Sequence, residues 1–313
     1  MGQCFDGRRV VTLSGFERPS RWSSQIIRGK IRPRQRCISK ATESGLSKGD
    51  PSPVLVLPGF LSGAESYQQF ADDLKKRGYI AEVLALESSE WYPTLWGGSY
   101  EFYVEKLADA IDELHGRYGP LALVGHSAGG WIARICLGSV PYQGQVFSKN
   151  EKVKSLVTLG TPHLSLEQYP FGRIEEKVMV DEQLDLPEGI PGSSLRFTNH
   201  FYPDGKAFEN VKIVSVMGKL TTGRPLSFED RIKYLFTQGG VPDEVARKAF
   251  AHTSYKANCG VGEVLGDGVC PLETGLLPAS KHILLDGVFH GPGSRTPWYG
   301  SQEVIPMWEG ELC

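Results

Sequence analysis

The sequence predicts an α/β protein with a mostly parallel sheet flanked by helices. Four short apolar runs, each typical of a strand buried on both faces, alternate with helical patterns, as in a doubly wound sheet. A glycine-rich turn, Gly125-His126-Ser127-Ala128-Gly129, joins one of these runs to a helix-forming stretch. The 313 residues are 40% hydrophobic and 22% charged, which is enough for one large core. We therefore expect a single domain over residues 46–313.

The elements of this fold can be placed from apolar spacing and from Gly and Pro breaks. A helix is expected at Glu65–Arg77, where apolar residues recur on one face and Gly78 ends the pattern. A second helix is expected at Ser99–Tyr118, before Gly119-Pro120. The expected strands are Pro53–Leu57, Tyr79–Leu86, Leu121–Val124, Val153–Leu159, Val211–Met217 and His282–Leu285.

Two long connections interrupt this alternation. Residues 164–210 are broken by four prolines, and residues 218–262 contain two short helical patterns, near Phe228–Phe236 and Asp243–His252. Connections of this length are usually functional or disordered, so both are expected to form lid-like insertions, one after the Val153–Leu159 strand and one after the Val211–Met217 strand.

The net charge of −2 gives no reason to expect nucleic acid as a partner, but the charge is uneven. Residues 1–40 contain ten Lys or Arg and two acids, so the remainder carries about −10. An arm rich in Arg and Ser without apolar periodicity resembles an organelle transit peptide, and residues 1–45 are expected to be disordered. This predicts a plastid, with the mitochondrion as the alternative; a basic tail of a cytosolic or nucleic-acid-binding protein is the competing interpretation.

The six cysteines are scattered, without the spacing of a metal site or a disulfide framework. Cys259 and Cys270 could pair across a loop, but two free thiols are expected. No apolar run approaches the roughly 18 residues of a membrane span. No metal and no cofactor are expected.

Ser127 is the candidate nucleophile. Glycines on both sides of a strand-to-helix turn allow strained backbone that presents a serine at a helix N-terminus, as in the G-x-S-x-G nucleophile elbow. A serine hydroxyl needs a base to take its proton and a third group to orient that base. In this arrangement the chain order is serine, acid, histidine.

His290 is the expected base because it is the histidine that follows the last strand, in Phe289-His290-Gly291. The expected acid is Asp267, which Gly266 and Gly268 flank in a tight turn. Asp286 is the competing acid, although it lies four residues before His290.

The oxyanion formed in acyl transfer needs two N–H donors. One is expected from Ala128 at the helix N-terminus and the other from Phe60, in the loop after Pro53–Leu57, with Leu61 as the second choice for this donor. Further substrate contacts are expected from residues near the strand ends and from the aromatic stretch 90–98, for which core packing is the competing interpretation. These candidates are Leu61, His126, Trp91, Trp96 and His163.

With these residues in order, the chain resembles the lipase and esterase branch of the α/β-hydrolase superfamily. The matching pieces are Pro58-Gly59-Phe60, Gly125–Gly130, Leu159–His163, Gly266–Pro271 and Phe289-His290-Gly291, which are also similar to those of proteins like the inositol deacylase of GPI anchors. Pro58 stands where many relatives have His. A basic arm before such a core resembles plant plastid hydrolases.

The combined prediction is a serine carboxylester hydrolase that acts on an acyl lipid or another apolar ester. An acyltransferase with the same triad, or a receptor-like binding protein with slow turnover, are the alternatives. Fold analogy does not choose among them. Peripheral contact with a membrane and the oligomeric state are left open by the sequence.

Overall fold

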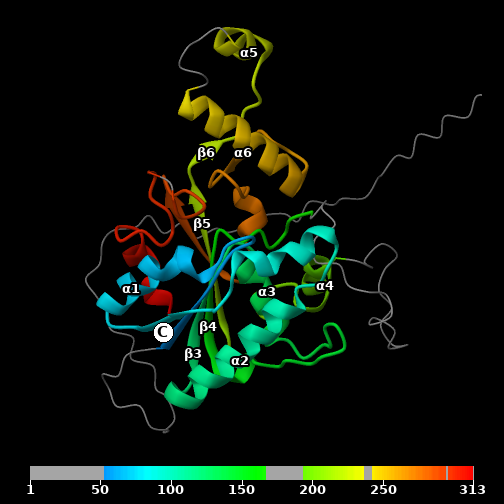
Figure 1. Ribbon diagram of the computed structural model, residues 1–313, viewed down its shortest axis with the longest axis vertical. Helices are drawn as coiled ribbons and strands as arrows, with labels where there is room; N and C mark the ends of the chain where they lie inside the picture. The colour runs from blue at the N-terminus through cyan, green and yellow to red at the C-terminus, as the bar shows by residue number, and fades with distance from the viewer. Residues whose placement is uncertain (1–52, 167–192, 236–241, 294, 313) are drawn as a thin grey trace, which may run out of the picture. The chain divides into compact units, whose positions relative to one another are not determined.

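Six parallel strands form the main sheet, in the order β2-β1-β3-β4-β5-β8. The computed structural model describes residues 53–166, 193–235, 242–293 and 295–312 (Figure 1). The strands are β1 (Pro53–Leu57), β2 (Ile80–Val83), β3 (Leu121–His126), β4 (Val153–Leu159), β5 (Lys212–Lys219) and β8 (Lys281–Asp286). A short antiparallel pair, β6 (Thr221–Thr222) with β7 (Leu265–Gly266), follows β5. The predicted α/β class, a mostly parallel sheet flanked by helices, is confirmed.

The central strands are buried on both faces because their side chains alternate between two apolar cores. On one face, Leu55 and Leu123 pack with residues of α2 (Glu101–Tyr118), α3 (Ala128–Leu137) and α4 (Ser194–Phe201). On the other face, Val54 and Val124 pack with α1 (Gln68–Lys76) and with the C-terminal residues 299–312. Figure 1 shows α1 and the red C-terminal segment on one side of the sheet and α2, α3 and α4 on the other.

The first connection is only partly the insertion that was expected. Residues 167–192 lie outside the described residues, but α4 belongs to the core, since Leu195 and Phe197 are 2% exposed. The prediction that all of 164–210 forms a lid is therefore wrong for the part that contains α4. Apolar residues on one side of a short helix are enough to bury it against α3, even between prolines.

The second connection contains the two expected helices, α5 (Phe228–Leu235) and α6 (Asp243–Cys259). Figure 1 shows α6 beside β6, and the hydroxyl of Tyr255 in α6 donates to the carbonyl of Thr221 in β6 at 3.2 Å. Whether this insertion works as a lid stays a prediction. The expected basic arm, residues 1–45, lies outside the described residues.

Most elements begin and end close to the predicted residues. β1 and β4 have the predicted bounds, whereas the expected strand Tyr79–Leu86 is shorter and the helix expected from Glu65 begins as a 3₁₀ turn, Ala64–Tyr67. Of the described cysteines, Cys136, Cys259 and Cys270 are free thiols, as expected. In the described part of the chain no helix combines the length and the apolar character needed to cross a membrane.

Candidate active site

Ser127 lies between the end of β3 and the start of α3, in a backbone conformation that L-residues rarely adopt. Its φ is 50° and its ψ is −124°. The turn is possible because Gly125 and Gly129 have no Cβ: one on Gly125 would lie 2.4 Å from the Cα of Gly130, and one on Gly129 would lie 2.7 Å from the carbonyl oxygen of Pro58. Strain of this kind at a half-buried serine is typical of functional sites.

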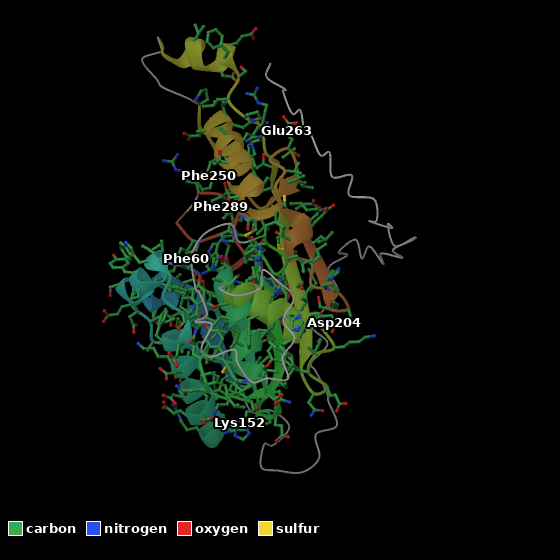
Figure 2. All side chains as sticks on the ribbon, turned by 90° about the vertical axis from the view of Figure 1, so that its right-hand side faces the viewer. Phe60, Lys152, Asp204, Phe250, Glu263 and Phe289 are labelled. Atoms are coloured by element: carbon green, nitrogen blue, oxygen red, sulfur yellow. The ribbon has the colours of Figure 1, made fainter. Side chains whose placement is uncertain are left out.

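His290 reaches Ser127 from the loop after β8. Its Nε2 lies 3.1 Å from the hydroxyl oxygen of Ser127. The backbone N–H of His290 donates to the carbonyl of Asp267 at 3.0 Å, which fixes the start of this loop. In Figure 2 Phe60 and Phe289, which follow β1 and β8, lie far from Lys152, which precedes β4, so the site lies at the carboxyl ends of the strands.

Asp267 orients His290 from the turn after β7. Its Oδ2 accepts a hydrogen bond from Nδ1 of His290 at 2.8 Å. Its Oδ1 accepts the backbone N–H groups of Val269 at 3.0 Å and Cys270 at 2.7 Å. Burial would raise the pKa of this carboxyl, but the charge of His290 and these hydrogen bonds outweigh burial, so the pKa lies below its usual 3.8. Asp267 is therefore an ionised carboxylate that keeps a proton on Nδ1 of His290 and leaves Nε2 facing Ser127.

The insertion helix α6 holds the turn that carries this acid. The backbone N–H of Gly268 donates to the hydroxyl of Tyr255 at 2.8 Å, and the hydroxyl of Ser254 donates to the carbonyl of Val269 at 2.6 Å. The competing acid, Asp286, is instead an exposed partner of Lys219 at the end of β8. The structure thus brings Ser127, His290 and Asp267 together in one hydrogen-bonded row and leaves Asp286 outside it.

The same corner contains three atoms with the spacing of metal ligands. Cys270, Asp267 and His290 each offer one atom, and these lie within 4.8 Å of one another. Both oxygens of Asp267, however, already accept two hydrogen bonds each. Burial also raises the pKa of the Cys270 thiol well above 9, which keeps it protonated. Asp267 and His290 are better explained as members of the Ser127–His290–Asp267 row, with Cys270 as a neutral neighbour, than as ligands of a metal.

His126 does not contact substrate as predicted, because both of its ring nitrogens have internal partners. Its Nε2 donates to the carbonyl of His290 at 2.7 Å, and its Nδ1 accepts the hydroxyl of Tyr67, also at 2.7 Å. The hydroxyl oxygen of Tyr67 in turn accepts the N–H of Gly59 at 3.0 Å. Burial, followed by the charge of His290, lowers the pKa of His126 to about 3, so its ring is neutral. His126 therefore connects the loop after β1 to the loop that carries the base.

The expected oxyanion donors lie in suitable surroundings. Ala128 is the first residue of α3, and the N–H groups of a first helical turn have no acceptor within the helix. Phe60 is partly buried and packs edge-on against Trp91, with ring centroids 5.4 Å apart. Leu61 follows with a positive φ of 58° and a side chain 42% exposed. The roles of Ala128, Phe60 and Leu61 stay predictions.

The two tryptophans of the aromatic stretch differ. Trp91 lies in a 3₁₀ helix, Ser88–Trp96, is fully buried, and donates its indole N–H to the carbonyl of Ser62 at 2.9 Å. The prediction that Trp91 contacts substrate is therefore wrong, and the competing interpretation of core packing is confirmed for it. Trp96, at the end of the same helix, is 80% exposed, so nothing in the described chain contradicts a contact with substrate.

His163 is also a core residue and not a substrate contact, contrary to the prediction. It is fully buried; its Nδ1 accepts from the Arg134 guanidinium at 3.2 Å, and its Nε2 bonds the hydroxyl of Thr158 at 3.1 Å. Burial lowers the pKa of Arg134 to about 9, and burial together with Arg134 lowers the pKa of His163 well below 6.5. The guanidinium also donates to the carbonyls of Thr198 and Tyr202, so this pair fastens α4 to α3.

One residue that contacts the row is absent from the sequence-based prediction. The hydroxyl of Tyr299, in the C-terminal segment, donates to Oδ2 of Asp267 at 2.8 Å. Tyr67, which contacts His126, is likewise absent from the predicted site residues. Neither tyrosine lies in a motif, because each reaches the site through tertiary packing.

Comparison with known proteins adds a partial family match. Residues 42–170 match the family model described as lecithin:cholesterol acyltransferase, a range that includes the elbow but less than half of the chain. None of the curated proteins matches this chain.

Several solved structures are similar to this chain at low identity. The lipase BlEst2 of Bacillus licheniformis in its mature form is 14% identical over 87% of this chain and 96% of that chain, with a TM-score of 0.49. A metagenome-derived lipolytic enzyme is 13% identical over 77% and 86%, with a TM-score of 0.38. The protein TT1662 of Thermus thermophilus is 14% identical over 85% and 90%, also with a TM-score of 0.38.

Proposed function

We propose that this protein is a serine carboxylester hydrolase that acts on an acyl lipid or another apolar ester. The observation that carries this proposal is the unbroken row of hydrogen bonds from Ser127 through His290 to Asp267, 3.1 Å and 2.8 Å long. A buried carboxylate, a histidine and a strained serine in this order have the geometry of an activated nucleophile. A purely structural role would not require that geometry.

The reaction begins when Nε2 of His290 takes the hydroxyl proton as the oxygen of Ser127 attacks the ester carbonyl carbon. The charged imidazole is stabilised by Asp267, and the N–H groups of Ala128 and Phe60 hold the oxyanion. His290 then gives its proton to the departing alcohol, which leaves an acyl-enzyme on Ser127. Water, deprotonated by His290, attacks the acyl carbon and releases the carboxylic acid and the free serine.

A fluorophosphonate probe and p-nitrophenyl esters of increasing chain length test this proposal. The wild-type protein should label at one serine and turn over the esters, and Ser127→Ala should lose both. The roles of His290 and Asp267 are tested by pairing a variant of each with a control variant of the same residue type. His290→Gln and Asp267→Asn should each lower kcat by about 10³ or more, whereas His282→Gln and Asp286→Asn should not. Undiminished turnover by Ser127→Ala would show that the scheme is wrong.

An acyltransferase is the second candidate, and the family match over residues 42–170 favours it. The same acyl-enzyme would then pass its acyl group to an alcohol instead of water. Supplying a long-chain alcohol during ester turnover separates the two reactions. Hydrolysis yields free acid alone, whereas transfer yields a new ester in proportion to the alcohol added.

The partner and the location belong to the same proposal. An apolar ester substrate is consistent with peripheral contact with a membrane, which flotation with phospholipid vesicles would detect. The resemblance to plastid hydrolases similar to GPI inositol deacylases supports a plastid location for the protein. A fluorescent fusion of residues 1–45 should enter plastids. Its retention in the cytosol, or its entry into mitochondria, would contradict this location.

A further inference from the structure

The carboxylate of Asp267 receives a fourth hydrogen bond that orienting His290 does not require. Oδ1 is held by two backbone N–H groups of its own turn. Oδ2 accepts from Nδ1 of His290 and from the hydroxyl of Tyr299, both at 2.8 Å. Tyr299 therefore shares with the base the single oxygen through which Asp267 acts.

The direction of the Tyr299 hydroxyl is fixed by its surroundings. Its oxygen accepts the N–H of Gly218 at 2.8 Å, so its one proton is left for Asp267. The ring is fully buried. The indole N–H of Trp308 donates to the backbone carbonyl of Tyr299 at 2.9 Å, which anchors this residue within the C-terminal segment. A donor held in this way is already oriented before substrate binds.

A tyrosine that only filled the core would need no hydrogen bond beyond the one that its hydroxyl oxygen accepts from the N–H of Gly218. The second bond has two consequences for the acid: it prevents the carboxylate from turning about Cβ–Cγ, and it withdraws negative charge from Oδ2. We propose that Tyr299 is a positioning residue that keeps Oδ2 of Asp267 in line with His290 and lowers the negative charge which that oxygen presents to the imidazole. This inference rests on the proposed use of the row to activate Ser127.

Neighbouring side chains add no charge that would mask the effect of Tyr299 on Asp267. Within the described part of the chain, the titratable groups that face Asp267 and His290 are Tyr299, Tyr255, Cys270 and His126. Burial raises the pKa of Tyr255 and raises those of Tyr299 and Cys270 well above their usual values; it lowers that of His126 to about 3. All four are therefore neutral between about pH 4 and pH 9, and none of them adds a charge beside the Asp267 carboxylate within that range.

The experiment compares Tyr299→Phe with a matched control, Tyr142→Phe. Tyr142 is also buried, and its hydroxyl accepts the N–H of Tyr100 at 2.9 Å and bonds Ser194 at 2.8 Å, but it packs on the opposite face of the sheet. Each variant loses one hydroxyl with two partners, so urea unfolding should show similar losses of stability. This comparison separates a structural cost from an effect on the row.

The expected result concerns the rate and its pH dependence. In Tyr299→Phe, kcat for p-nitrophenyl butyrate and the fluorophosphonate labelling rate of Ser127 should fall about tenfold, with KM unchanged. The acid limb of the kcat/KM profile should move up by about half a pH unit, because an unshielded carboxylate favours the charged imidazole more strongly. Incorporation of 3-fluorotyrosine at position 299, a stronger donor of the same shape, should move the limb in the opposite direction.

A proton NMR signal gives a readout that does not depend on activity. The proton between Nδ1 of His290 and Asp267 should resonate far downfield and should shift in Tyr299→Phe but not in Tyr142→Phe. If the signal and the acid limb stay in place and kcat matches that of Tyr142→Phe, Tyr299 has only a structural role. If the wild-type protein neither labels nor hydrolyses esters while the signal shifts, the proposed function is wrong but the positioning of Asp267 by Tyr299 stands.

Discussion

Replacing Gly160 by alanine should place a methyl group against the contact between acid and base. Gly160 follows β4 with a φ of +59°. A Cβ there would lie 2.8 Å from Cε2 of Tyr299, 2.9 Å from Oδ2 of Asp267 and 3.0 Å from Nδ1 of His290. Nothing larger than a hydrogen atom fits beside the bond that joins Asp267 to His290.

The size of the effect follows from these distances. Ordinary contacts to Cβ begin at 3.4 Å, so the three neighbours would have to move by 0.6, 0.5 and 0.4 Å. If Asp267 and His290 move apart by only about 0.4 Å, their 2.8 Å hydrogen bond reaches the upper limit of good hydrogen-bond length. We therefore expect kcat to fall by about 10²-fold. Backbone strain and overpacking should lower the free energy of unfolding by about 2–4 kcal/mol.

Ester turnover and urea unfolding of Gly160→Ala check this prediction, with Gly144→Ala as the control. Gly144 also has a positive φ, +80°, but a Cβ there would meet nothing within 4 Å. The control should lose about 1 kcal/mol of stability and keep its kcat. If Gly160→Ala loses the expected stability yet keeps kcat within about threefold of wild type, the contact between Asp267 and His290 is not needed for turnover.

Four further variants extend this reasoning. Tyr67→Phe removes the hydroxyl between Gly59 and His126, and kcat should fall about tenfold in initial-rate assays; a loss of stability alone would contradict this role. The pKa of Asp267 is lower in the folded than in the unfolded protein, so its carboxylate stabilises the fold above about pH 4. In urea titrations the wild-type protein should be more stable than Asp267→Asn at neutral pH, and this difference should disappear as the pH falls through the pKa of Asp267 in the folded protein. Between pH 6.5 and about pH 3, His126 takes up a proton only in the unfolded chain. The free energy of unfolding of the protein should therefore fall by up to about 1.4 kcal/mol for each unit by which the pH is lowered, and His126→Gln should reduce that slope. Trp96→Ala should change the free energy of unfolding by less than about 0.5 kcal/mol because its side chain is 80% exposed, while a raised KM for long-chain esters would place it beside the substrate.

The sequence predicted the row of Ser127, His290 and Asp267 because each residue lies in a short segment whose backbone follows from local chemistry. Glycines define the elbow and the acid turn, and chain order excludes the histidines that precede the acid. Strand β1 could be placed to the residue because it is a continuous apolar run in a sheet covered on both faces.

Side-chain direction could not be predicted in the same way. His126 and His163 both lie at the carboxyl ends of strands, as expected, but their rings turn inward to Tyr67 and Arg134. A strand alternates its faces, so position along the chain places a residue at the site without deciding whether it faces substrate or core. Trp91 and Trp96 lie in one 3₁₀ helix, and only tertiary packing decides which of the two indoles is buried.

The contact between Tyr299 and Asp267 could not be predicted from the sequence either. Tyr299 is separated from Asp267 by 32 positions and from Ser127 by far more, in a tail whose Pro and aromatic content has no helical or strand period. Its role depends on the C-terminal segment folding back over the face of the sheet that α1 also covers. No local pattern specifies such a return, because it is held by long-range burial.

The C-terminal segment also affects the order in which this protein can form during translation. The face covered by α2, α3 and α4 uses residues no later than Leu277, whereas the opposite face must also wait for Tyr299, Ile305 and Trp308. A nascent chain can therefore display Ser127 on a folded elbow long before Asp267 has its last hydrogen-bond donor. The acid of the row would gain its last donor only when the segment that contains Tyr299 folds back onto the sheet.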